Sequence, residues 1–155
     1  MIELFLMANH DFQEKMIALV RAFGWHRPAE TPCGQPVTIA EAHALLEIAR
    51  ADGISQNELT VSLNLAKSTV SRLISKIERR GWVVRQPHEQ DRRAYRLFLT
   101  PKGSEIAQQL AQARQSKMDG ILAQIPVGQR DDVLKSLDLL VKAIQAGETD
   151  EILEH

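Results

Sequence analysis

The segment from Leu63 to Thr100 constrains the fold of this chain more than any other part of it. It reads LNLAKSTVSRLISKIERRGWVVRQPHEQDRRAYRLFLT. Apolar residues recur at every third or fourth position from Lys67 to Arg80, which predicts an amphipathic helix, and Gly81 suits the left-handed conformation that ends one. Two short strand-like runs follow, at residues 82–86 and 95–99, on either side of a charged turn. The segment therefore predicts a helix followed by a β-hairpin wing.

A short, well-marked helix precedes this segment. Ser55 and Glu58 have the spacing of a capping box, in which each side chain accepts from the other residue's backbone N–H. Asn64 tolerates the left-handed conformation and can end that helix before the next one begins at Lys67. Two helices joined by a turn of about three or four residues form a helix-turn-helix.

Helical patterns also flank this core. Residues 2–23 predict a first helix, glycines and prolines break the chain at residues 24–37, and Thr38 is a plausible N-cap for a helix that stops at Asp52-Gly53. After the wing, Thr100-Pro101 opens a helix that should run to about Ile125, and a last helix should cover residues 130–146.

The expected fold class is mainly α with a small β-hairpin wing (α+β). We expect one domain over residues 1–152. It divides into a winged helix-turn-helix core at 38–100 and dimerisation helices at 2–23 and 101–146, while residues 153–155 look like the remnant of an expression tag.

Charge is concentrated in the same segment. Residues 64–98 contain nine Lys and Arg against three Asp and Glu, a net of +6, whereas the whole chain has a net charge of −1. Such asymmetry favours one surface that binds a polyanion, because phosphate neutralisation supplies most sequence-independent affinity for nucleic acid. The chain has no run of about 18 apolar residues and a single cysteine, Cys33, so we expect a cytoplasmic protein without a membrane span or an internal disulfide.

Hydrogen-bond donors line the outward face of the helix predicted from Lys67 to Arg80. Small hydroxyls between cations would let this helix enter a major groove, and the arginines at the wing tip suit a minor groove. The alternatives are an ordinary solvated helix face and a solvated turn. The candidate DNA-binding residues are Lys67, Ser68, Thr69, Ser71, Arg72 and Lys76 on the helix and Asp91, Arg92 and Arg93 on the wing.

The sequence resembles the MarR family of winged helix-turn-helix transcriptional regulators. The resemblance rests on Leu59, Leu63, the run KSTVSRL at 67–73, Glu78, Gly81-Trp82, and above all DRRAYRLFLTPKG at 91–103. It implies an obligate homodimer, a palindromic operator in double-stranded DNA, and control by a small ligand or by oxidation. Two positions depart from the family's pattern: Ala66 stands where a Ser or Asp cap is usual, and Thr60 replaces a small alanine.

The resemblance also implies a crevice for an aromatic or phenolic effector between the first two helices and the helix after the wing. Phe12, Met16, Phe23, Trp25 and His43 could line it, although each could equally pack the core. Cys33, Glu41 and His43 resemble part of a zinc set, but Gln108, Gln109 and Gln112 stand where histidines would be needed, so we expect no metal and no cofactor. Cys33 could be a peroxide-sensing thiol, but the chain has no second cysteine to resolve it, so we interpret it as an inert or incidental thiol.

The sequence favours a sequence-specific DNA-binding regulator, a ligand-responsive repressor that acts as a homodimer. An enzyme is disfavoured, because the chain has no Gly-rich phosphate loop, HExxH, GxSxG or paired carboxylates with a convergent base. The alternative is a winged-helix protein-interaction module without specific DNA binding, since a fold alone does not decide function.

Overall fold

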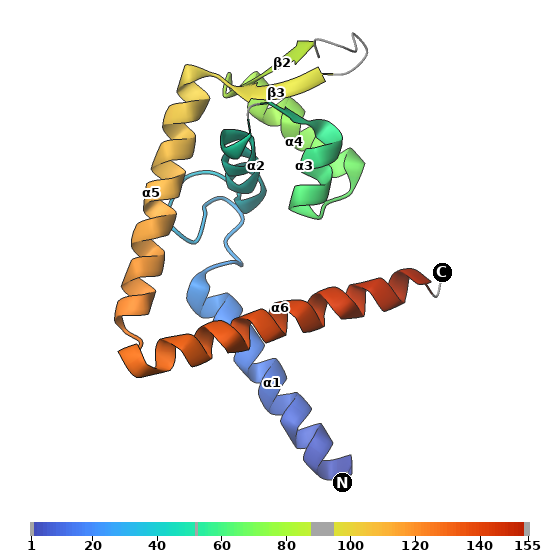
Figure 1. The fold of residues 1–155 in the computed structure, drawn as a ribbon, viewed down its shortest axis with the longest axis vertical. Helices are drawn as coiled ribbons and strands as arrows, with labels where there is room; N and C mark the ends of the chain where they lie inside the picture. Colours follow the sequence, from blue (N-terminus) through green and yellow to red (C-terminus); the bar gives the residue numbers. More distant parts are fainter. Residues whose placement is uncertain (1, 52, 88–94, 154–155) are drawn as a thin grey trace. The chain divides into compact units, whose positions relative to one another are not determined.

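The computed structural model describes residues 2–51, 53–87 and 95–153. Its elements follow the order expected for a winged helix (Figure 1). They are α1 (Ile2–Phe23), α2 (Ile39–Arg50), β1 (Ile54–Ser55), α3 (Gln56–Leu63), α4 (Lys67–Arg79), β2 (Val83–Pro87), β3 (Tyr95–Leu99), α5 (Pro101–Ala123), the 3₁₀ turn η1 (Val127–Gln129) and α6 (Arg130–Leu153).

The chain divides into two compact units, residues 1–114 and 115–155. The first unit holds the apolar core, to which α2, α3, α4, the sheet and the start of α5 all contribute. Its most deeply buried side chains include Leu45, Leu59, Ile74, Ile77 and Val83. The second unit consists of the end of α5, η1 and α6, and most of its large apolar side chains are exposed.

A small antiparallel sheet covers one end of the helices α2, α3 and α4 (Figure 1). Its strand order is β1-β3-β2, with Val83 opposite Leu99 and Pro87 opposite Tyr95. The hairpin predicted from the sequence is confirmed. The sequence did not predict the third strand, β1, which places Ile54 opposite Leu97. Two residues are too few to show an alternating pattern, so β1 has no signal of its own in the sequence.

Local capping explains where the core helices begin. Thr38 caps α2 and Ser55 caps α3, each in a complete capping box, with Glu41 and Glu58 as the reciprocal acceptors. Asn64 ends α3 in the left-handed conformation (φ 50°, ψ 48°), as its residue type predicts. These boundaries agree with the sequence prediction.

The longer helices differ from their predicted ends. α5 stops at Ala123 rather than near residue 125, and α6 continues to Leu153, whereas the sequence predicted an end at Ala146. Gly147 follows Ala146 without ending the helix, because a glycine costs a helix interior only about 1 kcal/mol. Within the described residues, no helix combines the length and the apolar character that crossing a membrane requires.

Candidate nucleic-acid interface

The start of α4 presents its first turn without a side-chain cap. Ala66 occupies the N-cap position in extended conformation (φ −60°, ψ 141°) and has no side-chain oxygen to accept a hydrogen bond. Its carbonyl oxygen accepts from the backbone N–H groups of Thr69 (2.9 Å) and Val70 (3.0 Å), so the helix begins normally. The positive end of the helix dipole is therefore not capped by a protein side chain at this point.

The outward face of α4 carries most of the predicted DNA-binding residues. Lys67, Ser68, Thr69 and Arg72 are exposed, and Ser71 is half-buried. The opposite face packs into the core through Val70, Leu73, Ile74 and Ile77. The structure thus brings five of the predicted residues together on the first half of one amphipathic helix.

Lys76, the sixth predicted residue on α4, lies in a different setting. Its Nζ is 3.0 Å from Oε1 of Glu41, and the guanidinium of Arg80 lies 3.5 Å from the same oxygen. Glu41 is 1% exposed and belongs to α2. The Lys76 side chain remains 45% exposed, but its charge is paired inside the protein.

The Glu41 carboxylate is ionised despite its burial. Burial by itself would raise the pKa of Glu41, but hydrogen bonds from Thr38, the ammonium of Lys76 and the charge of Arg80 outweigh it and hold the pKa below its ordinary value of 4.5. The backbone N–H and the hydroxyl of Thr38 both donate to Oε2, each at 2.9 Å. One oxygen therefore serves the α2 cap while the other faces two cations of α4.

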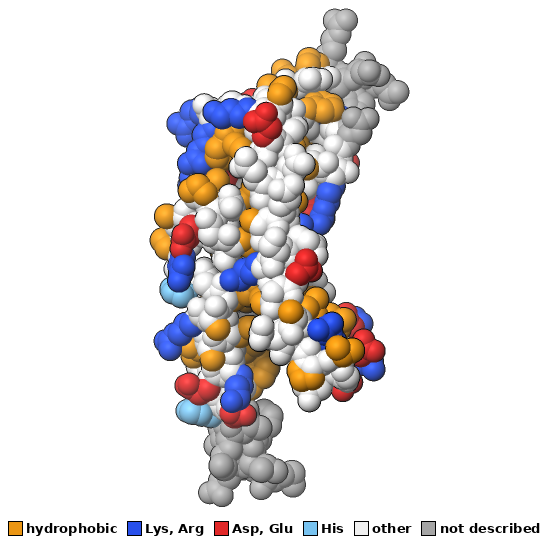
Figure 2. All heavy atoms as spheres, turned by 90° about the vertical axis from the view of Figure 1, so that its left-hand side faces the viewer, with side chains coloured by type: hydrophobic (Ala, Val, Ile, Leu, Met, Phe, Trp, Pro, Cys, Tyr) orange, Lys and Arg blue, Asp and Glu red, His pale blue; other side chains and the backbone are white. Residues whose placement is uncertain are grey.

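Other basic side chains near the end of α4 also make contacts within the protein. Arg79 donates to the carbonyl of Ser75, Arg85 pairs with Glu78 at 3.1 Å, and the guanidinium of Arg80 lies 4.7 Å above the ring of Trp82. Figure 2 shows basic side chains gathered along one edge of the upper part of the molecule. Part of the charge of residues 64–98 is thus neutralised or held locally.

The wing is anchored to the segment before α3 through β3. Arg96 of β3 donates to the Gly53 carbonyl at 2.6 Å, and the ring of Phe98 lies directly over Gly53, leaving no room there for a side chain. Asp91, Arg92 and Arg93, predicted at the wing tip, lie outside the described residues. The structure does show that β2 and β3, which flank them, are paired from Val83 to Pro87.

The base of the wing is tied to α5. The Thr100 hydroxyl donates to the Gly81 carbonyl at 2.7 Å and accepts from the Gly103 N–H at 3.0 Å, while the Thr100 N–H donates to the Trp82 carbonyl at 3.0 Å. Thr100 therefore caps α5 and fixes it against the turn after α4. This explains why a Thr-Pro-Lys-Gly sequence follows the last strand.

The predicted effector residues do not line one common pocket. Met16 lines a pocket of about 540 Å³ with Ile17, Val20, Arg21 and His26. The rings of Phe23 and Trp25 pack on each other with centroids 4.5 Å apart, and Phe12 is 54% exposed. His43 is exposed on α2. Only Met16 of the five borders this pocket.

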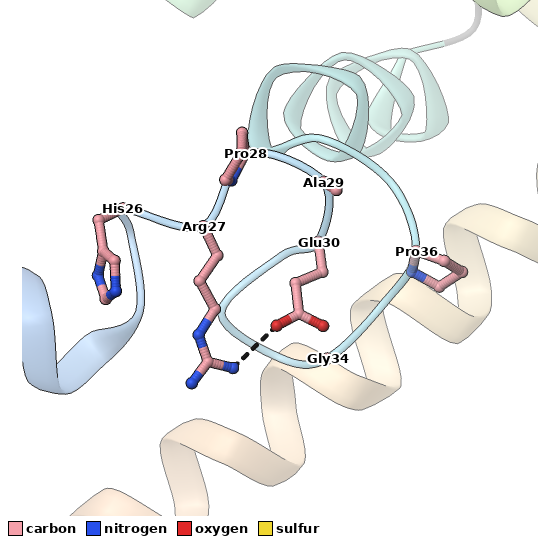
Figure 3. Close-up of a pocket in the computed structure, with 7 residues that line it drawn as sticks. All are labelled: His26, Arg27, Pro28, Ala29, Glu30, Gly34 and Pro36. Carbon is pink, nitrogen blue, oxygen red and sulfur yellow. Dashed lines mark hydrogen bonds and ion pairs between the residues drawn. The ribbon is translucent and has the colours of Figure 1, made fainter.

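A second pocket lies in the loop between α1 and α2 (Figure 3). It measures about 440 Å³, and its walls are His26, Arg27, Pro28, Ala29, Glu30, Gly34 and Pro36. Arg27 and Glu30 face each other and form an ion pair at 2.8 Å. Nowhere in the described part of the chain do three or more His, Cys, Asp or Glu side chains gather as metal ligands would.

Comparison with known proteins decides the family. Residues 35–94 match the family model described as MarR family, which covers α2, the helix-turn-helix and most of the wing. This part of the chain belongs to the MarR family. Among curated members, the transcriptional repressor MprA of Escherichia coli is 23% identical over 116 residues, which are 75% of this chain and 66% of MprA. In two of the curated relatives, the matched part spans only 57% and 66% of the relative's own length.

Solved MarR-family structures share the fold. FabT of Streptococcus pneumoniae, crystallised in complex with DNA, superposes with a TM-score of 0.72 at 20% identity and covers 92% of this chain and 98% of its own. PcaV of Streptomyces coelicolor, in complex with its natural ligand, gives a TM-score of 0.71 at 19% identity and covers 91% of this chain and 96% of its own. The expected winged helix with flanking N- and C-terminal helices is confirmed, and MarR proteins are transcription regulators rather than enzymes.

In the sequence, Glu41 stands out only as part of a zinc-like set with Cys33 and His43. The structure shows it as the buried partner of two basic residues on α4. The signal was present, because Thr38 and Glu41 have the same capping-box spacing that identified Ser55 and Glu58.

Proposed function

We propose that this MarR-family chain is a cytoplasmic, sequence-specific DNA-binding regulator that represses transcription as a homodimer on a palindromic operator. The observation that carries the proposal is the first half of α4, where an uncapped helix start and a row of exposed donors lie on a helix-turn-helix. The proposed major-groove residues are Lys67, Ser68, Thr69, Ser71 and Arg72. Asp91, Arg92 and Arg93 are proposed to act in the minor groove.

Exposed apolar side chains support the homodimer. Each of the two units exposes large hydrophobic residues that a second copy would cover, and patches of this kind on a small protein mark interaction sites. They include Phe12, Leu19 and Trp25 in the first unit and Ile121, Leu122, Val127, Leu134, Leu137, Leu139, Val141 and Ile144 in the second. In a dimer on DNA, the two α4 helices would reach successive major grooves about 34–36 Å apart.

The proposed effector is a small aromatic or phenolic acid. The ligand complex of PcaV supports a small-molecule effector, and its chemical class is inferred from a pocket in which Arg21 and His26 stand beside apolar Met16, Ile17 and Val20. A cation beside an apolar wall suits a ligand with a carboxylate and a ring. The effector would weaken DNA binding by preferring a dimer geometry that fits the operator poorly.

The test is fluorescence anisotropy of labelled duplex DNA from upstream of the protein's own gene, measured at several salt concentrations. Sedimentation of the protein without DNA should give twice the 17.4 kDa chain mass. Arg72→Ala should weaken binding and flatten the dependence of log affinity on log salt concentration by about two units, because one phosphate contact per protomer contributes about 0.9. Arg93→Ala should weaken binding by about 1–3 kcal/mol.

Arg50→Ala is the matched control. It removes the same charge from an exposed arginine on α2 that pairs with Glu47 at 2.9 Å. The control should bind DNA as the wild type does. Equal behaviour of Arg72→Ala and Arg50→Ala, or an affinity that does not change with salt, would refute the proposed interface and favour a protein-interaction module.

A further inference from the structure

Four polar residues follow each other at intervals of four along α4. Ser68, Arg72, Lys76 and Arg80 therefore share one side of the helix, although the row drifts gradually around it. The first two lie in the exposed half of the helix that is proposed to enter the groove. The last two direct their charges to Glu41, at 3.0 Å and 3.5 Å.

The buried Glu41 carboxylate should hold these two cations firmly. Its carboxylate is almost fully buried, and its other oxygen is already held by two hydrogen bonds from Thr38. A buried carboxylate that lost its cations would be an uncompensated charge, which is strongly unfavourable. Moving Lys76 and Arg80 to a phosphate would therefore leave the buried charge of Glu41 uncompensated. No ion pair holds Arg72 to an acid among the described residues.

The pairing of Lys76 and Arg80 with Glu41 keeps these two cations from contacting phosphate, which affects how the protein binds DNA. Phosphate contacts raise affinity for every DNA sequence alike, whereas base contacts distinguish one sequence from another. We propose that Glu41 is a positioning residue that sets DNA specificity: it acts as an internal counter-ion for Lys76 and Arg80 and so limits sequence-independent binding by α4. The inference rests on the proposed DNA-binding function.

The test compares Glu41→Gln with Glu47→Gln. Glutamine at position 41 can still complete the capping box with Thr38, so the start of α2 is kept while the charge is removed. Glu47 is on the same helix and pairs with Arg50, which makes Glu47→Gln a control of equal charge change. The probe is a labelled random-sequence duplex of 30 base pairs, with anisotropy measured between 50 and 200 mM salt.

Glu41→Gln should bind random DNA more tightly and with a steeper salt dependence. One new phosphate contact per protomer makes two per dimer, and steepens the slope of log affinity against log salt by about 1.8. The side-chain ordering needed to make these contacts reduces the gain, so we expect affinity for random duplex to rise about ten-fold at 100 mM salt. Glu47→Gln should change neither quantity beyond the small effect of net charge.

Lys76→Met, made in both backgrounds, identifies the cation. In the wild type it should leave the salt slope unchanged, because Lys76 is held by Glu41 and Arg80 remains to neutralise the carboxylate. In the Glu41→Gln background it should remove at least half of the added slope. Thermal unfolding of each variant is followed by circular dichroism. Every variant should melt above the temperature of the binding measurement, so that folded proteins are compared.

The outcomes separate the two proposals. A wild type that shows no salt-dependent DNA binding overturns the proposed function and this inference with it. A wild type that binds, together with Glu41→Gln and Glu47→Gln variants of equal slope, overturns the inference alone. The inference is also overturned when Lys76→Met lowers the slope in the wild-type background, because Lys76 would then already contact phosphate.

Discussion

Replacing Gly103 by alanine should destabilise the junction between the end of α4 and the start of α5. A Cβ at this position would overlap the Trp82 carbonyl oxygen and lie 2.8 Å from the carbonyl carbon, both of them backbone atoms that cannot rotate away. The start of α5 would have to move. That movement strains the two hydrogen bonds by which Thr100 holds the carbonyls of Gly81 and Trp82, at 2.7 and 3.0 Å.

The magnitude follows from three contributions. Overpacking costs about 1–3 kcal/mol, and each of two weakened hydrogen bonds costs about 0.5–1.5 kcal/mol. Alanine gains about 1 kcal/mol over glycine as a helix former, which offsets part of the loss. We expect a net destabilisation of about 3 kcal/mol, which lowers Tm by about 6–12 °C for a chain of this size.

Gly120→Ala is the control within the same helix. A Cβ there meets nothing within 4 Å, so the substitution should only add helix propensity and raise Tm by about 2 °C. Both variants are melted by circular dichroism at one protomer concentration, since dimerisation would make Tm depend on concentration. A Gly103→Ala variant that melts like the wild type, or like Gly120→Ala, would refute the reasoning about this junction.

Two further predictions concern the starts of α2 and α4. The pKa of Glu41 is lower in the folded protein than its ordinary 4.5, so its stabilising contribution is fully present above pH 4.5 and is lost as pH falls through the folded pKa. Glu41→Gln should therefore make the free energy of unfolding less dependent on pH at acidic pH. An unchanged pH dependence would contradict this. Ala66→Ser should supply the missing cap of α4 and raise stability by about 1 kcal/mol in a urea titration, whereas Ala49→Ser, exposed within α2, should not.

The helices and the hairpin could be predicted because their signals are local. Capping at Ser55, the left-handed residue at Asn64 and the Thr-Pro start of α5 each act within a few residues of the chain. The strand β1 could not be predicted, because its two residues are extended only through pairing with Leu97 and Arg96, about forty positions away. The end of α6 was missed because no breaker stands at residue 146, and a helix can pass through a single glycine.

In the candidate site, too, the residues with a local sequence signal could be predicted and the others could not. The exposed donors at the start of α4 followed from helical periodicity, since a face opposite Val70, Leu73, Ile74 and Ile77 has to point outward. The effector residues were assigned by resemblance alone, and the structure puts Phe23 against Trp25 and leaves Phe12 exposed instead of lining one pocket with them. Which apolar residues enclose a pocket depends on packing between segments, which periodicity does not describe.

The charge of residues 64–98 shows most clearly what a sequence count leaves out. Its net of +6 marks this segment as the DNA-binding candidate, yet the count treats every lysine and arginine as equally available. Glu41 lies outside the counted segment and pairs with two of those cations, and Arg85 is paired with Glu78 within it. Because a buried carboxylate holds its partners far more firmly than solvent does, the charge offered to DNA is smaller than the charge counted. Lys67 and Arg72, at the start of α4, belong to the part of this charge that no described acid holds in an ion pair.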